Sequence, residues 1–133
     1  MRVVFDTNIY IAAFVADGIC ARLVRRARKR EFELILCHVI TREFSTKLKV
    51  KFRCTAKEVE QACSLISEAA TAIFNEGVLP KPVCRDHDDD PILACVETTS
   101  AEYLITGDKD LLVLKQHGEC KILSPRDFEL MFD

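Results

Sequence analysis

Short apolar segments alternate with longer segments of helical periodicity along this chain. Each short segment is rich in β-branched or aromatic residues, which is typical of a strand buried in a parallel sheet. These segments are residues 2–5, 32–37, 101–106 and 120–123. Because parallel strands need crossover connections, the alternation predicts an α/β fold with a mostly parallel central sheet, flanked by helices on both faces.

The segments between the predicted strands carry apolar residues at every third or fourth position, as helices that pack on a sheet do. They are residues 9–15, 19–30, 40–52, 55–70 and 109–117, with a further helix starting at Asp90-Pro91. Thr55 and Glu58 have the spacing of a capping box, and proline is favoured at the first helical position. Residues 78–83 are interpreted as a loop or an edge strand. The sequence contains no linker or repeat, which predicts a single domain over residues 1–133.

Composition limits the class of protein. Apolar residues make up 49% of the sequence and charged residues 30%, which is ordinary for a globular protein. No segment reaches the roughly 20 apolar residues of a membrane-spanning helix, and Asp6 comes too early for a signal peptide. We therefore expect a cytoplasmic protein with no membrane partner.

The chain has seven cysteines, which is an odd count, and no two of them form a C-x-x-C pair. Four lie among apolar neighbours, where a thiol behaves as a small core residue: Cys37, Cys63, Cys84 and Cys95. The alternative is a zinc site that uses Cys37 with His38, or Cys84 with His87. Zinc sites usually pair their ligands at short spacing, which these residues do not. We expect these cysteines to be buried and reduced.

Two acidic residues follow predicted strands. Asp6 comes directly after Phe5, and Asp108 follows Thr106 after a single glycine. The carboxyl ends of parallel strands meet at one edge of the sheet, so neighbouring strands would bring the two carboxylates together. Either acid alone would be interpreted as a turn or cap residue.

Two further acids lie on predicted helices. Asp90 is explained as an N-cap, and a capping carboxylate keeps a free oxygen for a metal ion. Asp86 and Asp88 precede it, and solvation explains both. Glu43 flanks the apolar stripe of its helix, and helix geometry alone leaves open whether it enters the site or pairs with Lys47 at i+4.

Carboxylates gathered at one edge repel each other unless a cation lies between them. Hard oxygen ligands without a convincing His or Cys favour Mg²⁺ or Mn²⁺ over zinc. An ion held in this way can activate water, neutralise a phosphate and stabilise the leaving oxygen. The pattern therefore favours a metal-dependent nuclease.

The sequence resembles the PIN-domain nucleases at four motifs in register. They are Asp6-Thr7-Asn8 after the first strand, Glu43 on a mid-chain helix, residues 85–94 around Asp90-Pro91, and residues 103–110 around Asp108. The likeness spans nearly the whole chain and is strongest to the PIN proteins regarded as toxins of toxin–antitoxin systems, the VapC-type toxins. It implies endoribonuclease activity with one or two divalent ions, a homodimer, and often inhibition by a small antitoxin.

The same resemblance implies roles for individual residues. The catalytic and metal-binding acids are Asp6, Glu43, Asp90 and Asp108, with Asp110 as a weaker metal ligand. The polar residues that orient ligands or water are Thr7, Asn8 and Thr106. His87 stands where another small or polar residue is expected.

Basic residues concentrate between residues 21 and 57, which hold twelve Lys or Arg and three Glu. One basic stripe recurs at helical spacing and consists of Arg22, Arg25, Arg26 and Lys29. It could neutralise RNA phosphates, and a solvated helix face or antitoxin docking are the alternatives. Residues 47–53 add a second basic stretch.

Three other classes of protein are alternatives to a nuclease. A haloacid-dehalogenase-type phosphatase needs a second Asp two residues after the first, where Asn8 stands. A phospho-receiver domain needs an acidic pair near its first strand, which is not evident. A catalytically silent PIN-like module for binding or regulation is the serious alternative, and the intact set of four acids argues against it.

Overall fold

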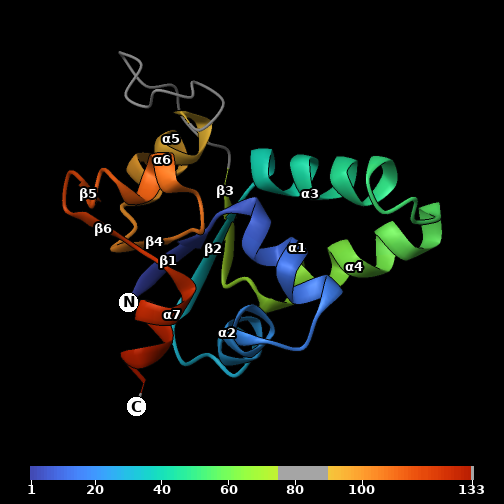
Figure 1. Cartoon of the computed structure of the whole chain (residues 1–133), viewed down its shortest axis with the longest axis horizontal. Coiled ribbons are helices and arrows are strands. Elements are labelled where there is room, and N and C mark those ends of the chain that lie inside the picture. Colours follow the sequence, from blue (N-terminus) through green and yellow to red (C-terminus); the bar gives the residue numbers. More distant parts are fainter. Residues whose placement is uncertain (75–89, 133) are drawn as a thin grey trace.

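The computed structural model describes residues 1–74 and 91–132. Of Asp90 it describes the backbone alone. Within these residues the strands form one sheet in the order β3-β2-β1-β4-β6-β5 (Figure 1). They are β1 (Arg2–Phe5), β2 (Glu33–Cys37), β3 (Ala72–Phe74), β4 (Tyr103–Ile105), β5 (Gln116–His117) and β6 (Cys120–Leu123). Neighbouring strands are parallel except β5 and β6. The predicted α/β fold with a mostly parallel sheet is confirmed.

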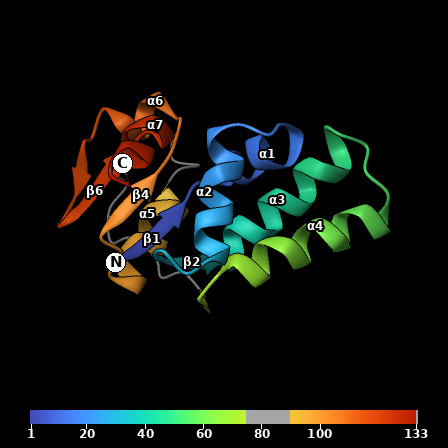
Figure 2. The same ribbon diagram turned by 90° about the horizontal axis from the view of Figure 1, so that it is seen from below.

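The helices are α1 (Thr7–Val15), α2 (Ile19–Arg28), α3 (His38–Val50), α4 (Ala56–Ala69), α5 (Asp90–Thr99), α6 (Lys109–Leu112) and α7 (Pro125–Leu130). Helices α1 to α4 pack together on one side of the molecule, and α6 packs beside β6 (Figures 1 and 2). The predicted capping box is present: Glu58 N donates to Thr55 Oγ1, and Thr55 N donates to Glu58 Oε1.

The central strand β1 is buried on both faces. Val3, Val4 and Phe5 are all fully buried, and successive strand residues point to opposite faces. Phe5 contacts the rings of Tyr10 on α1 and Phe128 on α7, with centroid distances of 5.7 and 6.5 Å. Helices α1 and α7 therefore cover the face to which Phe5 points.

The opposite face of the sheet is covered by α5. Val4 pairs in register with Ile35, and Cys37 lies two residues further along β2 on the same face. Cys37 forms a disulfide with Cys95 of α5. The expectation that these two cysteines are reduced is therefore wrong. It rested on the apolar neighbours of each cysteine, which do not reveal that the end of β2 and α5 adjoin.

Three elements were missed and one was drawn too long. The helix predicted over residues 109–117 ends as α6 at Leu112, because the chain turns at Lys115, which has a φ of 63°. A tight hairpin then joins β5 to β6 through Gly118, whose φ of 61° suits glycine. The short edge strand β3 and the helix α7 were also missed. Residues 78–83 lie outside the described residues.

The described residues form the seven helices α1 to α7. None of these helices alone is both long enough and apolar enough to cross a bilayer. The pair α1 and α2 passes the length and composition test together, but the two helices are bent by 105°.

Candidate active site

Asp6 lies where β1 ends and α1 begins, beside the end of β4. Phe5 pairs with Ile105, and Asp6 N donates to Ile105 O at 2.9 Å, so Asp6 is held next to Thr106. Asp6 caps α1, because its Oδ1 accepts from Thr7 N at 2.7 Å. Its Oδ2 accepts from Thr106 Oγ1 at 2.8 Å. The carboxylate is thus fixed through both oxygens and is 6% exposed.

Thr106 also links Asp6 to Asp108. The Thr106 Oγ1 atom accepts from Asp108 N at 3.0 Å, so one hydroxyl bridges the two predicted acidic positions. Asp108 caps α6 by accepting from Asp110 N at its Oδ1, at 2.9 Å. The predicted meeting of the two strand-end acids at neighbouring strands is what the sheet order produces.

Glu43 reaches the same edge from α3. Its Oε2 accepts from Thr7 Oγ1 at 2.8 Å, while Phe44 and Leu48 of the same helix are buried in the core. The alternative pairing of Glu43 with Lys47 does not occur. Lys47 Nζ donates instead to Asn8 Oδ1 at 2.8 Å. The polar residues after β1 therefore tie α1 to α3 at two points.

The carboxylates influence each other electrostatically. Burial raises the pKa of the Asp6 carboxyl, the hydrogen bonds from Thr106 and Thr7 lower it, and the nearby Glu43 and Asp108 raise it further. This is the situation that a bound cation would relieve, because it reverses the local electrostatic preference.

The donor chemistry fits a hard divalent ion, since the described acids offer oxygens alone. Glu43 accepts a hydrogen bond at Oε2 and Asp108 accepts one at Oδ1. However, no group of three or more His, Cys, Asp or Glu residues in the described part of the chain is placed to hold a metal ion. The side chain of Asp90 lies outside that part, although its backbone begins α5. Asp86, His87 and Asp88 also lie outside it.

A groove beside Glu43 was not anticipated from the sequence. It has a volume of about 280 Å³ and is lined by Val39, Arg42, Glu43, Thr46 and Lys47. Two of these side chains are basic and lie one helical turn or less from the carboxylate. Lys47 carried this signal in the sequence, because it is at i+4 from Glu43 and residues so spaced are neighbours on a helix surface.

The predicted basic stripe lies on α2, which ends near the amino edge of the sheet, away from Asp6 (Figure 1). Arg26 is held within the fold: it binds both oxygens of Glu129 at 2.8 and 3.1 Å, pairs with Glu31 at 2.8 Å, and lies over the ring of Phe132. The Arg26 guanidinium lowers the pKa of the Glu129 carboxyl.

The other stripe residues are more exposed. Arg25 pairs with Asp17 at 3.0 Å, and both side chains are more than half exposed. Arg22 lies 3.9 Å from Glu129 and is 55% exposed. Lys29 is exposed at the C-cap of α2. A nucleic-acid surface on α2 stays a prediction, and these three residues are its accessible members.

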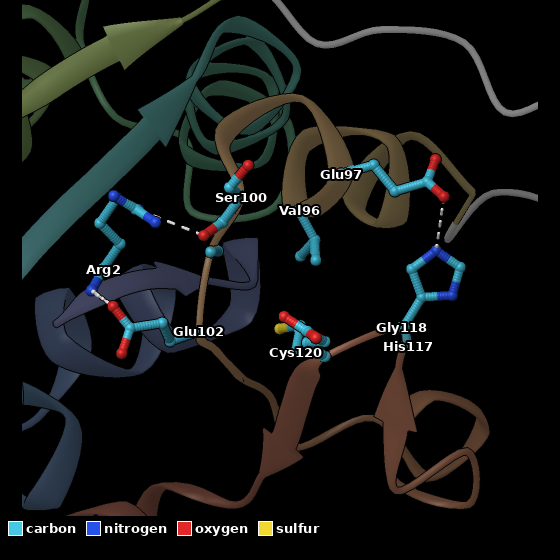
Figure 3. A pocket seen from close by; sticks show the side chains of 10 residues that line it. Arg2, Val96, Glu97, Ser100, Glu102, His117, Gly118 and Cys120 are labelled. Carbon is cyan, nitrogen blue, oxygen red and sulfur yellow. Dashed lines mark hydrogen bonds and ion pairs between the residues drawn. The ribbon is translucent and has the colours of Figure 1, made fainter.

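A larger pocket of about 440 Å³ opens at the opposite, amino edge of the sheet (Figure 3). Three of its charged residues make polar contacts within the pocket: Arg2, Glu97 and Glu102. Arg2 Nε donates to Ser100 O at 3.2 Å, Arg2 N donates to Glu102 at 3.2 Å, and His117 lies 3.3 Å from Glu97. Asp6, Glu43 and Asp108, the predicted acids whose side chains the structure describes, do not line it, so the candidate active site is the carboxyl edge.

Comparison with known proteins identifies a family that matches most of this chain. Residues 2–110 match the family described as PIN domain. The chain is also similar to Uncharacterized protein MJ1680 of Methanocaldococcus jannaschii, with 26% identity over 147 residues that cover 96% of this chain and 89% of that protein. The range that matches the family contains all four predicted acids.

Proposed function

Because the chain belongs to the PIN domain family, whose members are generally nucleases, we propose that it is an endoribonuclease that hydrolyses RNA phosphodiester bonds with Mg²⁺ or Mn²⁺. The observation that carries the proposal is the Asp6 carboxylate. It is buried at the end of the central strand, fixed through both oxygens, and close enough to Glu43 and Asp108 for their charges to raise its pKa. Buried like charges of this kind are typical of a site built for a cation.

In this proposal Asp6, Glu43, Asp90 and Asp108 hold the ion, with Asp110 as a weaker candidate. When bound, the ion lowers the pKa of a water molecule and neutralises the charge that develops on the phosphate. The side chains of the protein orient the groups that hold the ion. Thr106 and Thr7 donate to carboxylate oxygens, which orients the acids before substrate arrives and lowers the pKa of Asp6 toward its charged form.

The substrate is proposed to be RNA whose backbone runs along the groove on α3. Arg42 and Lys47 line that groove together with Glu43, so phosphates flanking the scissile bond would meet positive charge there. The described site offers no row of aromatic side chains for base stacking. Recognition is therefore proposed to depend on the backbone and shape of the RNA rather than on its bases.

The decisive experiment is a cleavage assay on a generic single-stranded RNA with Mg²⁺, Mn²⁺, Ca²⁺ or excess EDTA. The wild type should cleave with Mg²⁺ or Mn²⁺, cleave poorly with Ca²⁺, which accepts looser coordination, and not at all with EDTA. Asp108→Asn should abolish cleavage, because the swap keeps the shape and removes a charge. Glu119→Gln, at the amino edge, is the matched control. Full activity in EDTA would refute the metal mechanism.

The second candidate function is a catalytically silent PIN-like module for binding or regulation. The observation that favours it is that the described acids do not by themselves form a group of three placed to hold a metal ion. The same assay separates the two functions. A silent module would bind RNA in a filter assay and leave it intact with every cation.

A role as the toxin of a toxin–antitoxin system is proposed on the resemblance, together with a homodimer and a small antitoxin as partners. Induced expression in a bacterial host, comparing the wild type with Asp108→Asn, tests toxicity. Size exclusion with light scattering tests the dimer. Growth arrest that depends on Asp108 would support a toxin, and equal growth of both strains would count against it.

A further inference from the structure

A covalent bond joins the two helices that carry predicted ligands on opposite sides of the candidate site. Cys37 is the N-cap of α3, and Cys95 lies in the middle of α5. The two residues are 58 positions apart in sequence, form a disulfide, have Cα atoms 6.3 Å apart and are both 0% exposed. The bond therefore lies inside the protein, directly beneath the carboxyl edge of the sheet.

The disulfide is close in sequence to both predicted ligands. Glu43 lies six residues after Cys37 on α3, and Asp90 lies five residues before Cys95 at the start of α5. A helix is stiff over fewer than two turns, so the position of each sulfur fixes the helix segment that carries the ligand. The bond thus fixes the separation of the two helices. The positions of Asp6 and Asp108 are set by the strands of the sheet instead.

The disulfide is also an important link between these helices. Helix α3 packs more extensively against α1 and α4 than against α5. In addition, Thr7 and Asn8 of α1 bind Glu43 and Lys47 of α3, so α3 is well fixed on that side. The placement of α5 relative to α3 depends more strongly on the covalent bond, so α5 is the helix that its loss would release.

We propose that the Cys37–Cys95 disulfide is a redox-controlled brace of the candidate active site. In the oxidised protein the bond holds the part of α3 that carries Glu43 and the start of α5 at a fixed separation beside the candidate site. In the reduced protein this separation is no longer fixed, so the ion binds more weakly and RNA cleavage falls. The inference rests on the proposed function and adds its regulation.

The chemistry balances with a small-molecule disulfide as oxidant. The thiolate of one cysteine attacks a sulfur of the oxidant and releases one thiolate product, which gives a mixed disulfide. The thiolate of the other cysteine then displaces the second thiolate, so two thiols of the protein lose two protons and two electrons to the reagent. A dithiol reverses both steps. Because both cysteines are fully buried, exchange requires α5 to open locally from α3, which makes it slow.

The first measurement is the state of the cysteines. The full chain is treated with oxidised glutathione or with a phosphine reductant, which is then removed so that it cannot bind metal. Alkylation in denaturant and peptide mapping should find Cys37 and Cys95 linked in the first sample and both alkylated in the second. Failure of this pair to form under oxidising conditions would overturn the brace.

The second measurement is Mn²⁺ binding, followed by electron paramagnetic resonance of the free ion. Loss of residues that orient metal ligands typically weakens binding about 10- to 100-fold, so the reduced protein should bind Mn²⁺ at least about tenfold more weakly than the oxidised one. Hydrogen exchange should speed up in α5 more than in α4. Equal Mn²⁺ affinity in both states would overturn the proposal.

Variants separate the bond from the loss of a thiol. Cys37→Ala with Cys95→Ala should bind Mn²⁺ as weakly as the reduced wild type and should not respond to redox treatment. Cys120→Ala is the matched control, because it removes another buried thiol at the amino edge of the sheet, and its redox response should persist. If the double variant does not fold, the comparison of oxidised and reduced wild type still decides.

Cleavage by the same samples distinguishes this inference from the proposed function. Redox-dependent Mn²⁺ affinity without RNA cleavage in either state would refute the nuclease and support the brace. Cleavage that is equal in both states, with equal Mn²⁺ affinity, would support the nuclease and refute the brace.

Discussion

The hydroxyl of Thr106 donates to Asp6 Oδ2 at 2.8 Å and accepts from Asp108 N at 3.0 Å. One fully buried side chain thus joins two residues that the sequence separates by about a hundred positions. Its role can be tested without touching either acid.

Thr106→Val should lower both stability and cleavage. Valine has nearly the shape of threonine, but it leaves the buried Asp6 carboxylate without a donor and Asp108 N without an acceptor. The loss should reduce the free energy of unfolding by roughly 1–3 kcal/mol. Urea unfolding and the RNA cleavage assay measure the two effects. Thr106→Ser keeps the hydroxyl and should restore most of both, and a valine variant as active as the wild type would show that this hydroxyl does not organise the site.

Asp6→Asn should stabilise the protein at neutral pH in the absence of divalent ions, while abolishing cleavage. Burial, together with Glu43 and Asp108, raises the folded-state pKa of Asp6 above its ordinary value of 3.8. Between those two pKa values the folded protein keeps a proton that the unfolded chain has lost, so wild-type stability falls as pH rises through this window. Asparagine has no such proton to lose.

The stability of Asp6→Asn and of the wild type, measured as a function of pH, tests this prediction. The stability advantage of Asp6→Asn should be absent below the ordinary pKa of Asp, should grow as pH rises through the raised pKa, and should then stay constant. Urea midpoints measured in EDTA from pH 3 to pH 8 would show it. An advantage that is the same at every pH would assign the effect to packing rather than to charge.

Arg26→Gln should destabilise the fold and leave the salt dependence of RNA binding unchanged. Arg26 binds Glu129, and both of these side chains are less than a quarter exposed, so loss of this pair should reduce the free energy of unfolding by roughly 1–3 kcal/mol. The double variant Arg25→Gln, Lys29→Gln should do the reverse, since the exposed pair of Arg25 with Asp17 contributes little.

Filter binding over a salt series, beside thermal unfolding, distinguishes these variants. If Arg25 and Lys29 contact phosphates of a single strand, their loss should flatten the salt slope by about 1.4. A slope that stays the same in the double variant would remove α2 from the RNA surface.

Lys47→Gln should weaken RNA binding more than it slows catalysis. Lys47 lines the groove beside Glu43, and glutamine can still donate to Asn8 while carrying no charge. Loss of one phosphate contact should reduce the salt slope by about 0.7 and raise KM more than it lowers kcat. Lys49→Gln, on the exposed side of the same helix, is the control. Identical effects of the two variants would show that the groove is not where the backbone lies.

The sequence predicted those parts of the fold that depend on local pattern. The strands at residues 2–5 and 120–123, the capping box of Thr55 and the helix start at Asp90 all follow from periodicity or cap chemistry. Helix α7 carries the same signal as α5, since Ser124 caps it and Pro125 follows, so it could have been found. Strands β3 and β5 have three and two residues, too few for any periodicity to be visible.

The positions of site residues were predictable where they follow from the pairing of neighbouring strands. They were not predictable where a side chain has more than one partner within reach. Asp6 and Asp108 were placed by the rule for parallel strand ends. Spacing alone could not tell whether Glu43 binds Lys47 or turns toward Thr7, because that choice depends on α1 packing against α3. The pairing of Cys37 with Cys95 likewise depends on contact between distant segments.

The order of the strands in the sheet also decides when the site can exist. β1 pairs with β2 about thirty residues later, but its other neighbour, β4, begins at Tyr103. Pairings this distant in the chain form late in folding, and during synthesis they must wait until the second strand has left the ribosome. Asp6 precedes Thr106 and Asp108 by about a hundred residues, so it meets them only after β4 has been synthesised. Until then, a nascent chain lacks the arrangement of carboxylates on which the proposed activity depends.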